Sequence, residues 1–517
     1  MKETKITRCF IALMVLSLGL VSCEGFVDGV DPLINQVEDD LLNNESQLEF
    51  LITGVQGKFG RSGEFEGAPH IIWRIAGYSD EMVHGMFDSA PDHFTYVQDG
   101  PPDLDFYEGD WDNYHTTRFL ADNLIQRVEE LDATGGISDQ ALKERALWWG
   151  NFVGGLMRMY LADHWGARAL EGNTPGATVT TKEQLDNGEF GAFYSSAELH
   201  EQARNMFNAA IGLDPGDIPN PDKVLWSFIA RTYLFDGMDA EAKSAAEKGL
   251  QQGDEPFTIP HTARFENVMW LQSGRNNAVL FNAHPRFVQY VLDDRKEGEI
   301  VSELTQDDID GGIVTRSLRG PEGEEGEPGH RDTVDPRAGF ANPNERLPLW
   351  EKKIIRSPYG PINPATRWAE FREGAGYTQD IYPNRDDPFP LIDWREMELI
   401  LAEVAINAGD NATGLMHINN VRVYHGLDPY TLDQMLAYDN PAGGASTTGG
   451  ALQAGVPETK YTGPLGLLIE ERDKTLWLKG TRIVDQRRFG LWHLPDGKFK
   501  NYMPIPRSET NVNPNVP

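Results

Sequence analysis

Two stretches of the sequence place aromatic residues beside polar ones without the spacing of a helix face. A sugar presents an apolar C–H side that stacks on an aromatic ring, and its hydroxyl groups need polar partners nearby. These residue types therefore predict a sugar-binding surface, although core packing is the competing interpretation for any single ring. The first stretch contains Trp73, Tyr78, Asp80, His84, Phe87 and Tyr96, and the second contains Trp270, Arg286, Phe287 and Tyr290, with Arg316 and Trp350 further along.

The sequence lacks the usual signatures of catalysis. It has no Gly-x-Ser-x-Gly elbow, no His-Glu-x-x-His zinc pair and no phosphate-binding glycine loop ending in Lys-Ser or Lys-Thr. The chain contains 80 acidic residues, so two carboxylates that resemble the catalytic pair of a glycosidase would occur by chance in many places along it. We therefore predict a protein that is not an enzyme and needs no cofactor.

One acidic segment hints at calcium. Asp307, Asp308 and Asp310 precede Gly311, but the spaced ligands and the bidentate glutamate of a twelve-residue calcium loop are missing. A solvated acidic loop is the better interpretation, and we predict no metal site.

The first residues have the pattern of an export signal. Lys2, Lys5 and Arg8 precede an apolar run from Cys9 to Leu20, which is shorter than the roughly 18 residues that span a bilayer. The run ends in Leu-Val-Ser before Cys23 and resembles the bacterial lipobox. We predict a signal peptide over residues 1–22 and a lipid anchor on Cys23; an ordinary secretory signal with a chance cysteine is the alternative.

The charge of the chain excludes one class of partner. The net charge of −34 becomes −36 when the leader, with Lys2, Lys5, Arg8 and Glu3, is removed. Such a surface repels phosphate backbones and anionic lipids. Nucleic acid is therefore not expected as a partner, and membrane attachment must come from the lipid.

Much of the remaining chain has helical spacing. Over 224–250, large, small and aromatic residues recur around a turn at Gly237 in the tetratricopeptide pattern, and 394–424 repeats it more weakly around Gly409. Ser195 and Glu198 form a capping-box pattern before another helix. Since one such pair cannot bury its own face, around four stacked pairs are expected. Four tryptophans lie in helical pattern and are assigned to the core: Trp111, Trp148, Trp149 and Trp226.

The C-terminal residues carry the most specific pattern. It contains Glu471, Arg472, Leu476, Gly480, Arg482, Asp485, Arg487, Arg488, Phe489 and Gly490, then Pro504-Ile505-Pro506, Ser508-Glu509 and Asn513-Pro514. This pattern resembles the SusD/RagB family of surface lipoproteins. Further matches are Ser79-Asp80-Glu81, Trp111, Tyr114, Asn123, Asp335-Pro336-Arg337, Pro390-Leu391-Ile392, Glu396, Leu401, Ala402, Glu403 and Asn420-Val421-Arg422. Thr475 and Lys479 depart from the glutamates common in the family, and Asp393 departs from its arginine, which puts individual salt bridges in doubt.

The charges of this C-terminal pattern allow two interpretations. Glu471, Arg472, Arg482, Asp485 and Arg487 alternate in sign at helical and near-helical spacing. A paired network that fixes the last segment to the helical repeats would require this alternation. The arginines could instead contact ligand, and we favour the structural interpretation.

The resemblance implies a mostly α-helical fold. Tetratricopeptide-like helix pairs would form a scaffold, and a loop-rich ligand-binding remainder would pack on one side. We expect one unit over residues 23–517, with the loop-rich region at about 255–385. Two long loops are expected. Arg319–Gly339 is rich in Gly, Glu and Pro, and Asp439–Thr459 is rich in Gly, Ala and Thr.

The resemblance also implies a role. Family members are outer-membrane lipoproteins that accompany SusC-like TonB-dependent transporters, and the chain would act as an outward-facing lid that captures an oligosaccharide or polysaccharide fragment. Capture of peptides or another nutrient by the same lid remains open, as does an assembly module without a small ligand. The ligand-binding residues expected are Trp73, Tyr78, Asp80, His84, Tyr96, Trp270, Arg286 and Tyr290.

Overall fold

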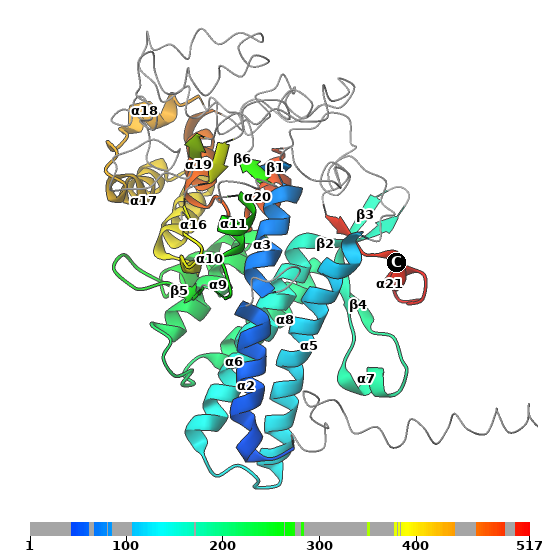
Figure 1. Cartoon of the computed structure of the whole chain (residues 1–517). Coiled ribbons are helices and arrows are strands. Elements are labelled where there is room, and N and C mark those ends of the chain that lie inside the picture. The colour runs from blue at the N-terminus through cyan, green and yellow to red at the C-terminus, as the bar shows by residue number, and fades with distance from the viewer. Residues whose placement is uncertain are drawn as a thin grey trace, which may run out of the picture.

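The computed structural model describes residues 43–60, 67–79, 81–84, 106–169, 172–262, 264–273, 281–283, 349–351, 377–379, 381–382, 384–439, 462–491 and 502–517. The described chain is mostly helical, as predicted (Figure 1). Its helices are η2 (Glu45–Gln47), α2 (Leu48–Gly60), α3 (Gly67–Tyr78), α5 (Phe106–Ala133), α6 (Gln140–His164), α7 (Lys182–Asp186), α8 (Ser196–Ala210), α9 (Pro221–Phe235), α10 (Asp239–Ala246), α11 (Val268–Ser273), α16 (Trp394–Asn407), α17 (Asn411–Tyr424), α18 (Leu432–Leu436), α19 (Gly463–Thr475), α20 (Arg482–Phe489) and α21 (Arg507–Thr510).

The strands are short and form small sheets beside the helices. They are β1 (Met82–His84), β2 (Trp165–Ala169), β3 (Gly172–Val179), β4 (Ala192–Ser195), β5 (Phe257–Ile259), β6 (Phe281–Ala283), β7 (Leu349–Glu351), β8 (Tyr377–Gln379), β9 (Phe389–Ile392) and β10 (Met503–Pro504). The order β10-β2-β3-β4 makes the four-stranded sheet, and β1–β6, β5–β9 and β7–β8 are antiparallel pairs.

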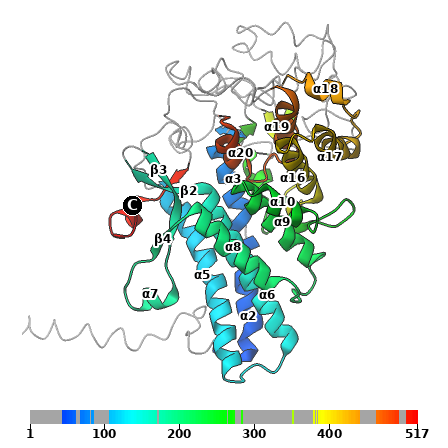
Figure 2. The same cartoon turned by 180° about the vertical axis from the view of Figure 1, so that it is seen from behind.

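The helices pack one on the next as a repeat scaffold (Figures 1 and 2). In space, α5, α6, α8, α9, α10, α16 and α17 follow one another, and α2 lies along α5 and α6. The two predicted pairs are confirmed as α9/α10 and α16/α17, and the glycines at their turns, Gly237 and Gly409, have φ of +73° and +80°. A third hairpin is α5/α6, and α8 packs between α6 and α9. The predicted capping box also forms, since Ser195 and Glu198 each accept a hydrogen bond from the other's backbone N–H.

The core contains the tryptophans assigned to it. Trp111, Trp148 and Trp149 are buried, and Trp226 is partly buried with the Lys248 ammonium 4.1 Å from the centre of its ring. In the part of the chain that the structure describes, no helix is long and apolar enough to cross a membrane.

Helix α6 lies so close to α8 that a side chain has no room at the contact. A Cβ atom on Gly155 would meet the Phe207 ring at 2.7 Å and the Ala203 carbonyl oxygen at 3.2 Å. We expect Gly155→Ala to lower the free energy of unfolding by about 1–2 kcal/mol, because overpacking of about 1–3 kcal/mol exceeds the gain in helix propensity. Urea denaturation of the two proteins measures this.

The matched control is Gly57→Ala in α2, where a Cβ atom would meet nothing within 4 Å. It is expected to be neutral or stabilising by up to about 1 kcal/mol. Equal effects of the two substitutions would contradict the close contact between α6 and α8.

The last residues of the chain form an edge strand of the four-stranded sheet. Strand β10 pairs in parallel with β2, and the Ile505 N–H donates to the Gly166 carbonyl oxygen at 3.2 Å. Glu509 accepts hydrogen bonds from the Thr178 hydroxyl at 2.7 Å and from the Asn513 amide at 2.6 Å. The Pro-Ile-Pro-x-Ser-Glu ending therefore has a structural role, since it fixes the C-terminal segment to this sheet. Residues 503–513 are called the C-terminal clip below.

Candidate ligand-binding site and the charge network beneath it

The structure brings together the segments from which the two aromatic stretches arise. Strand β1 of the first pairs with β6 of the second, with Met82 opposite Ala283 and His84 opposite Phe281. Helix α11 of the second stretch contacts α3 of the first. Nearly 200 residues of sequence thus separate two segments that share one ladder (Figure 1).

Trp73 and Tyr78 lie inside the molecule. Both belong to α3, so the interpretation that they stand outside helical structure is wrong. Their side chains are 4% and 1% exposed, and the Tyr78 hydroxyl donates to the Tyr502 carbonyl oxygen at 2.7 Å. Every residue of α3 is buried. Its two polar side chains, His70 and Arg74, stand one turn apart and lie against Asp110 of α5, so even the polar side of this helix is buried.

Trp270 is the predicted aromatic that remains partly accessible in the described part. It lies in α11, whose first turn is held by Asn267: the Asn267 side-chain oxygen accepts from the Met269 N–H at 2.9 Å. The side-chain amide of Asn267 donates to the Asp387 carbonyl oxygen at 2.9 Å. Sequence reasoning missed Asn267, although an asparagine just before an apolar run is a helix-capping signal.

Several predicted residues lie outside the described part. His84 and Trp350 stand in β1 and β7, but their side chains are not described. The residues named in the sequence analysis that lie outside the described ranges are Cys23, Asp80, Phe87, Tyr96, Arg286, Phe287, Tyr290, Asp307, Asp308, Asp310, Gly311 and Arg316. The predicted loop Arg319–Gly339 and most of Asp439–Thr459 also fall there. Among the residues that are described, no cluster of three or more His, Cys, Asp or Glu side chains could hold a metal ion.

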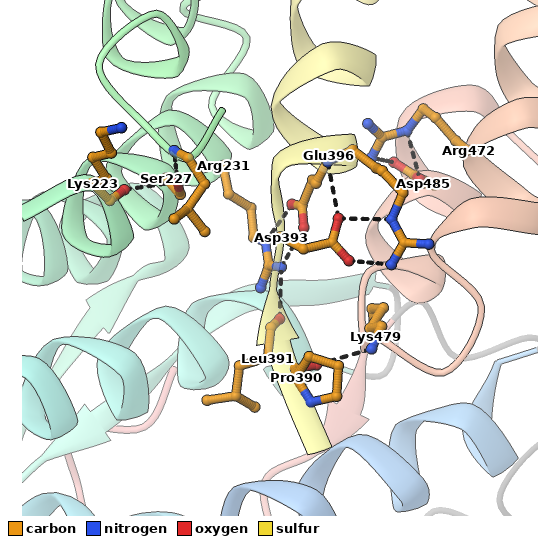
Figure 3. Close-up of polar contacts among 12 residues, drawn as sticks. Lys223, Ser227, Arg231, Pro390, Leu391, Asp393, Glu396, Arg472, Lys479 and Asp485 are labelled. Atoms are coloured by element: carbon orange, nitrogen blue, oxygen red, sulfur yellow. Dashed lines mark hydrogen bonds and ion pairs between the residues drawn. The ribbon is translucent and has the colours of Figure 1, made fainter. Parts of the chain in front are cut away.

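The C-terminal charges form a buried network that joins the last helices to the repeats (Figure 3). Arg472 of α19 donates to both carboxylate oxygens of Asp485 in α20, at 2.9 and 3.0 Å, and lies 3.7 Å from Glu403 of α16. Arg488 bonds to Asp485 at 2.9 Å and also to Glu403. Arg472, Asp485 and Glu403 are buried and Arg488 is partly buried, which supports the structural interpretation that the network fixes α19 and α20 to the scaffold.

Two further bonds extend the network. Arg422 of α17 donates to Glu471 at 2.6 Å, and Arg487 donates to the Asp163 carbonyl oxygen of α6 at 2.6 Å. Deeper in the scaffold, Arg231 of α9 makes two hydrogen bonds of 2.6 Å to Glu396 of α16 (Figure 3). Buried charges of this kind must be paired to be tolerated.

Lys479 and Asp393 lie close enough in the fold for each to shift the pKa of the other. Burial lowers the pKa of Lys479 to about 8, while the nearby Asp393 carboxylate partly offsets that effect. Burial alone would raise the pKa of Asp393, but Arg395 and then Lys479 bring it down to about 2. The Lys479 ammonium donates to the Pro390 carbonyl oxygen at 2.9 Å (Figure 3). Lys479 and Asp393 are thus buried near each other, each with a hydrogen-bonding partner of its own, Pro390 and Arg395.

A histidine between two carboxylates resembles part of a catalytic triad but cannot act as a base. The two ring nitrogens of His200 bond to Asp236 at 2.6 Å and Asp163 at 3.0 Å. Burial would lower its pKa, yet the hydrogen bonds and charges of the two carboxylates raise it to about 9. Neither nitrogen is left to accept a proton from a substrate, so this group joins α6, α8 and α9 as a buried cation.

Comparison with solved structures identifies the fold. A SusD superfamily protein from Bacteroides vulgatus is similar at a TM-score of 0.59 and 16% identity, over 91% of this chain and 98% of that one. A SusD-like carbohydrate binding protein from Bacteroides fragilis gives 0.59 and 15% over 93% and 100%. A SusD superfamily protein from Bacteroides thetaiotaomicron gives 0.56 and 15% over 92% and 99%. No protein-family model and no curated protein matches the sequence. The chain has the fold of the SusD superfamily, as its motifs predicted.

Proposed function

We propose that this protein captures an oligosaccharide or polysaccharide fragment at the cell surface and delivers it to a SusC-like TonB-dependent transporter, without catalysing a reaction. The observation that carries the proposal is the β1–β6 ladder, which joins the two aromatic-rich stretches beside the partly accessible Trp270. Proteins of this fold include SusD-like carbohydrate binding proteins. Aromatic rings with adjacent polar groups are what a sugar requires.

The ligand contacts that we propose come from the predicted residues. Trp270 would stack on the sugar. The remaining contacts would come from residues in or near β1 and β6 in the sequence: Asp80, His84, Tyr96, Arg286 and Tyr290. Trp73 and Tyr78 would support this surface from below, because they are buried in α3. The helical scaffold would meet the transporter, and a lipid on Cys23 would hold the protein at the outer membrane, facing outside.

The proposal is tested by titrating the full chain in detergent with a panel of oligosaccharides and a panel of peptides in a calorimeter. We expect at least one oligosaccharide to bind and the peptides not to bind. Binding of peptides alone would replace the glycan with a peptide ligand in the same lid role. Binding of neither, together with recovery of a stable partner protein, would favour the assembly module.

The transporter is tested separately. An affinity tag on this chain should recover a TonB-dependent barrel from membranes solubilised in mild detergent. Recovery of the tagged chain without a barrel would count against the lid.

Trp270→Ala is expected to weaken binding of the oligosaccharide found in the panel by about tenfold. A stacked ring contributes about 1.4 kcal/mol to binding, which corresponds to a tenfold change in Kd. Trp226→Ala is the matched control, because this ring is also partly buried but lies on the scaffold beneath Lys248. Calorimetric titration should show unchanged affinity for that variant. Equal losses in both variants would show that Trp270 does not contact the sugar.

Cys23→Ala is expected to release the protein from the membrane, because the residual acidic surface has no affinity for anionic lipid. Fractionation of cells, followed by detection of the chain in soluble and membrane fractions, measures this. Retention in the membrane would contradict the lipid anchor.

A further inference from the structure

The residue before β1, Glu81, is hydrogen-bonded to residues near the C-terminus of the chain. Glu81 is 1% exposed, and its carboxylate accepts a hydrogen bond from the Leu478 backbone N–H at 2.7 Å. Its backbone carbonyl accepts from the Trp477 indole N–H at 3.2 Å. Side chain and backbone of one residue are therefore fixed by two adjacent residues that lie almost 400 positions later.

The turn that supplies these donors is itself constrained. Leu478 has a φ of +59°, which is costly for a bulky side chain and persists only where the surroundings determine it. Gly480, at φ +75°, brings the turn against α3, where an added Cβ atom would lie 3.2 Å from the Ile72 side chain. The turn thus contacts α3 through Gly480 and the start of β1 through Leu478.

The charge network closes this turn. Arg472 and Asp485 stand on either side of it, in α19 and α20, and their two hydrogen bonds join the helices from which the turn begins and ends. Glu403 of α16 lies 3.7 Å from Arg472 and pairs with Arg488, which also bonds to Asp485. A path of hydrogen bonds and ion pairs therefore runs from the repeat scaffold through the turn 476–481 to Glu81.

We infer that Glu81 is a positioning residue: it fixes the β1–β6 ladder to the C-terminal charge network and thereby sets the geometry of the ligand-binding segments. It touches no ligand itself, because its side chain is enclosed and bonded to the turn. The partly accessible Trp270 lies in α11, which contacts both α3 and β6. The effect on ligand rests on the proposed function, whereas the effect on the ladder does not.

The experiment compares amide hydrogen exchange of the full chain in detergent for the wild type and Glu81→Ala. We expect exchange in peptides covering 82–84 and 281–283 to rise at least tenfold, with little change in α6. Glu81→Gln should stay near the wild type, because its side-chain carbonyl still accepts from Leu478. Glu509→Ala is the control, since it removes a carboxylate with two hydrogen bonds from the C-terminal clip and should leave β1 and β6 unchanged. A uniform rise over the whole chain, or none at the ladder, would overturn the inference.

Affinity separates the inference from the proposed function. For the oligosaccharide found in the panel, Glu81→Ala should bind at least fivefold more weakly and Glu81→Gln about as well as the wild type. Faster amide exchange at the β1–β6 ladder without any loss of affinity would overturn the positioning role of Glu81. It would leave the proposed glycan capture intact. If the wild type binds no sugar, the proposed function fails, and the exchange experiment still decides whether Glu81 holds the ladder. Should Glu81→Ala not fold, Trp477→Phe removes the indole donor together with part of a buried ring, and should raise exchange at the ladder in the same direction.

Discussion

Replacing Arg472 by alanine is expected to lower the free energy of unfolding by about 3 kcal/mol, because it removes the buried cation shared by Asp485 and Glu403 and leaves both carboxylates to the partly buried Arg488. Arg472 is 1% exposed and pairs with Asp485, and Glu403 lies 3.7 Å away. Burial would lower the pKa of Arg472, but the two carboxylates raise it well above its usual range. The side chain is therefore charged at every pH at which the protein folds. Urea denaturation at pH 7 measures the loss.

The control for this prediction is an ion pair on the surface. Lys243 and Glu247 stand one helical turn apart in α10, 3.9 Å from each other, with both side chains exposed. Lys243→Ala should change stability by no more than about 0.5 kcal/mol, as expected for such pairs. A small effect of Arg472→Ala would show that the C-terminal charges are not what fixes α19 and α20. Their role would then have to be sought in ligand contact.

The second large effect concerns His200 and depends on pH. The pKa of His200 is raised from 6.5 to about 9 in the folded protein. Folding therefore favours the protonated ring, and this contribution is fully present below pH 6.5 and is lost as the pH rises through 9. The shift corresponds to about 3 kcal/mol. We expect His200→Asn to be destabilised relative to the wild type at pH 6, and this difference to shrink by about 3 kcal/mol by pH 10.

Urea denaturation of both proteins across this range measures the change, and the difference between them removes other titrations. That subtraction matters because Lys479 acts in the opposite direction. Its pKa is lowered to about 8, so its charged form disfavours folding, and this penalty diminishes as the pH rises from 8 to 10.5. A wild-type-minus-variant difference that is the same at pH 6 and pH 10 would contradict the buried cation.

The repeat scaffold could be predicted because its signals are local. Large and small residues at three- and four-residue spacing identify α9/α10 and α16/α17, and Ser195 with Glu198 identifies the start of α8. The sign alternation of the C-terminal charges likewise indicated their pairing. The helix pairs and the capping box depend on residues within a few turns of each other, whereas the distant partners of the C-terminal charges, such as Glu403 and Arg422, became visible only in the fold.

The candidate site was less predictable because its geometry depends on distant pairing. Strands β1 and β6 have three residues each, too few for an alternating pattern to be recognised. The polar residues of α3, His70 and Arg74, lie against Asp110 of α5 instead of facing solvent, so the burial of Trp73 and Tyr78 depends on a distant element. The burial of Lys479 could only be recognised once β9 and the turn 476–481 were placed together, because its ammonium donates to the Pro390 carbonyl oxygen of β9.

The central claim is that ligand binds beside α11 and the β1–β6 ladder, and that the C-terminal charges support this surface from within. The most direct measurement is amide hydrogen exchange of the full chain with and without a saturating concentration of the bound oligosaccharide. We predict slower exchange in peptides covering 81–84, 268–273 and 281–283, and no change in α19 and α20. Protection concentrated in α19, α20 or the α16/α17 pair, with none at the ladder, would contradict this assignment.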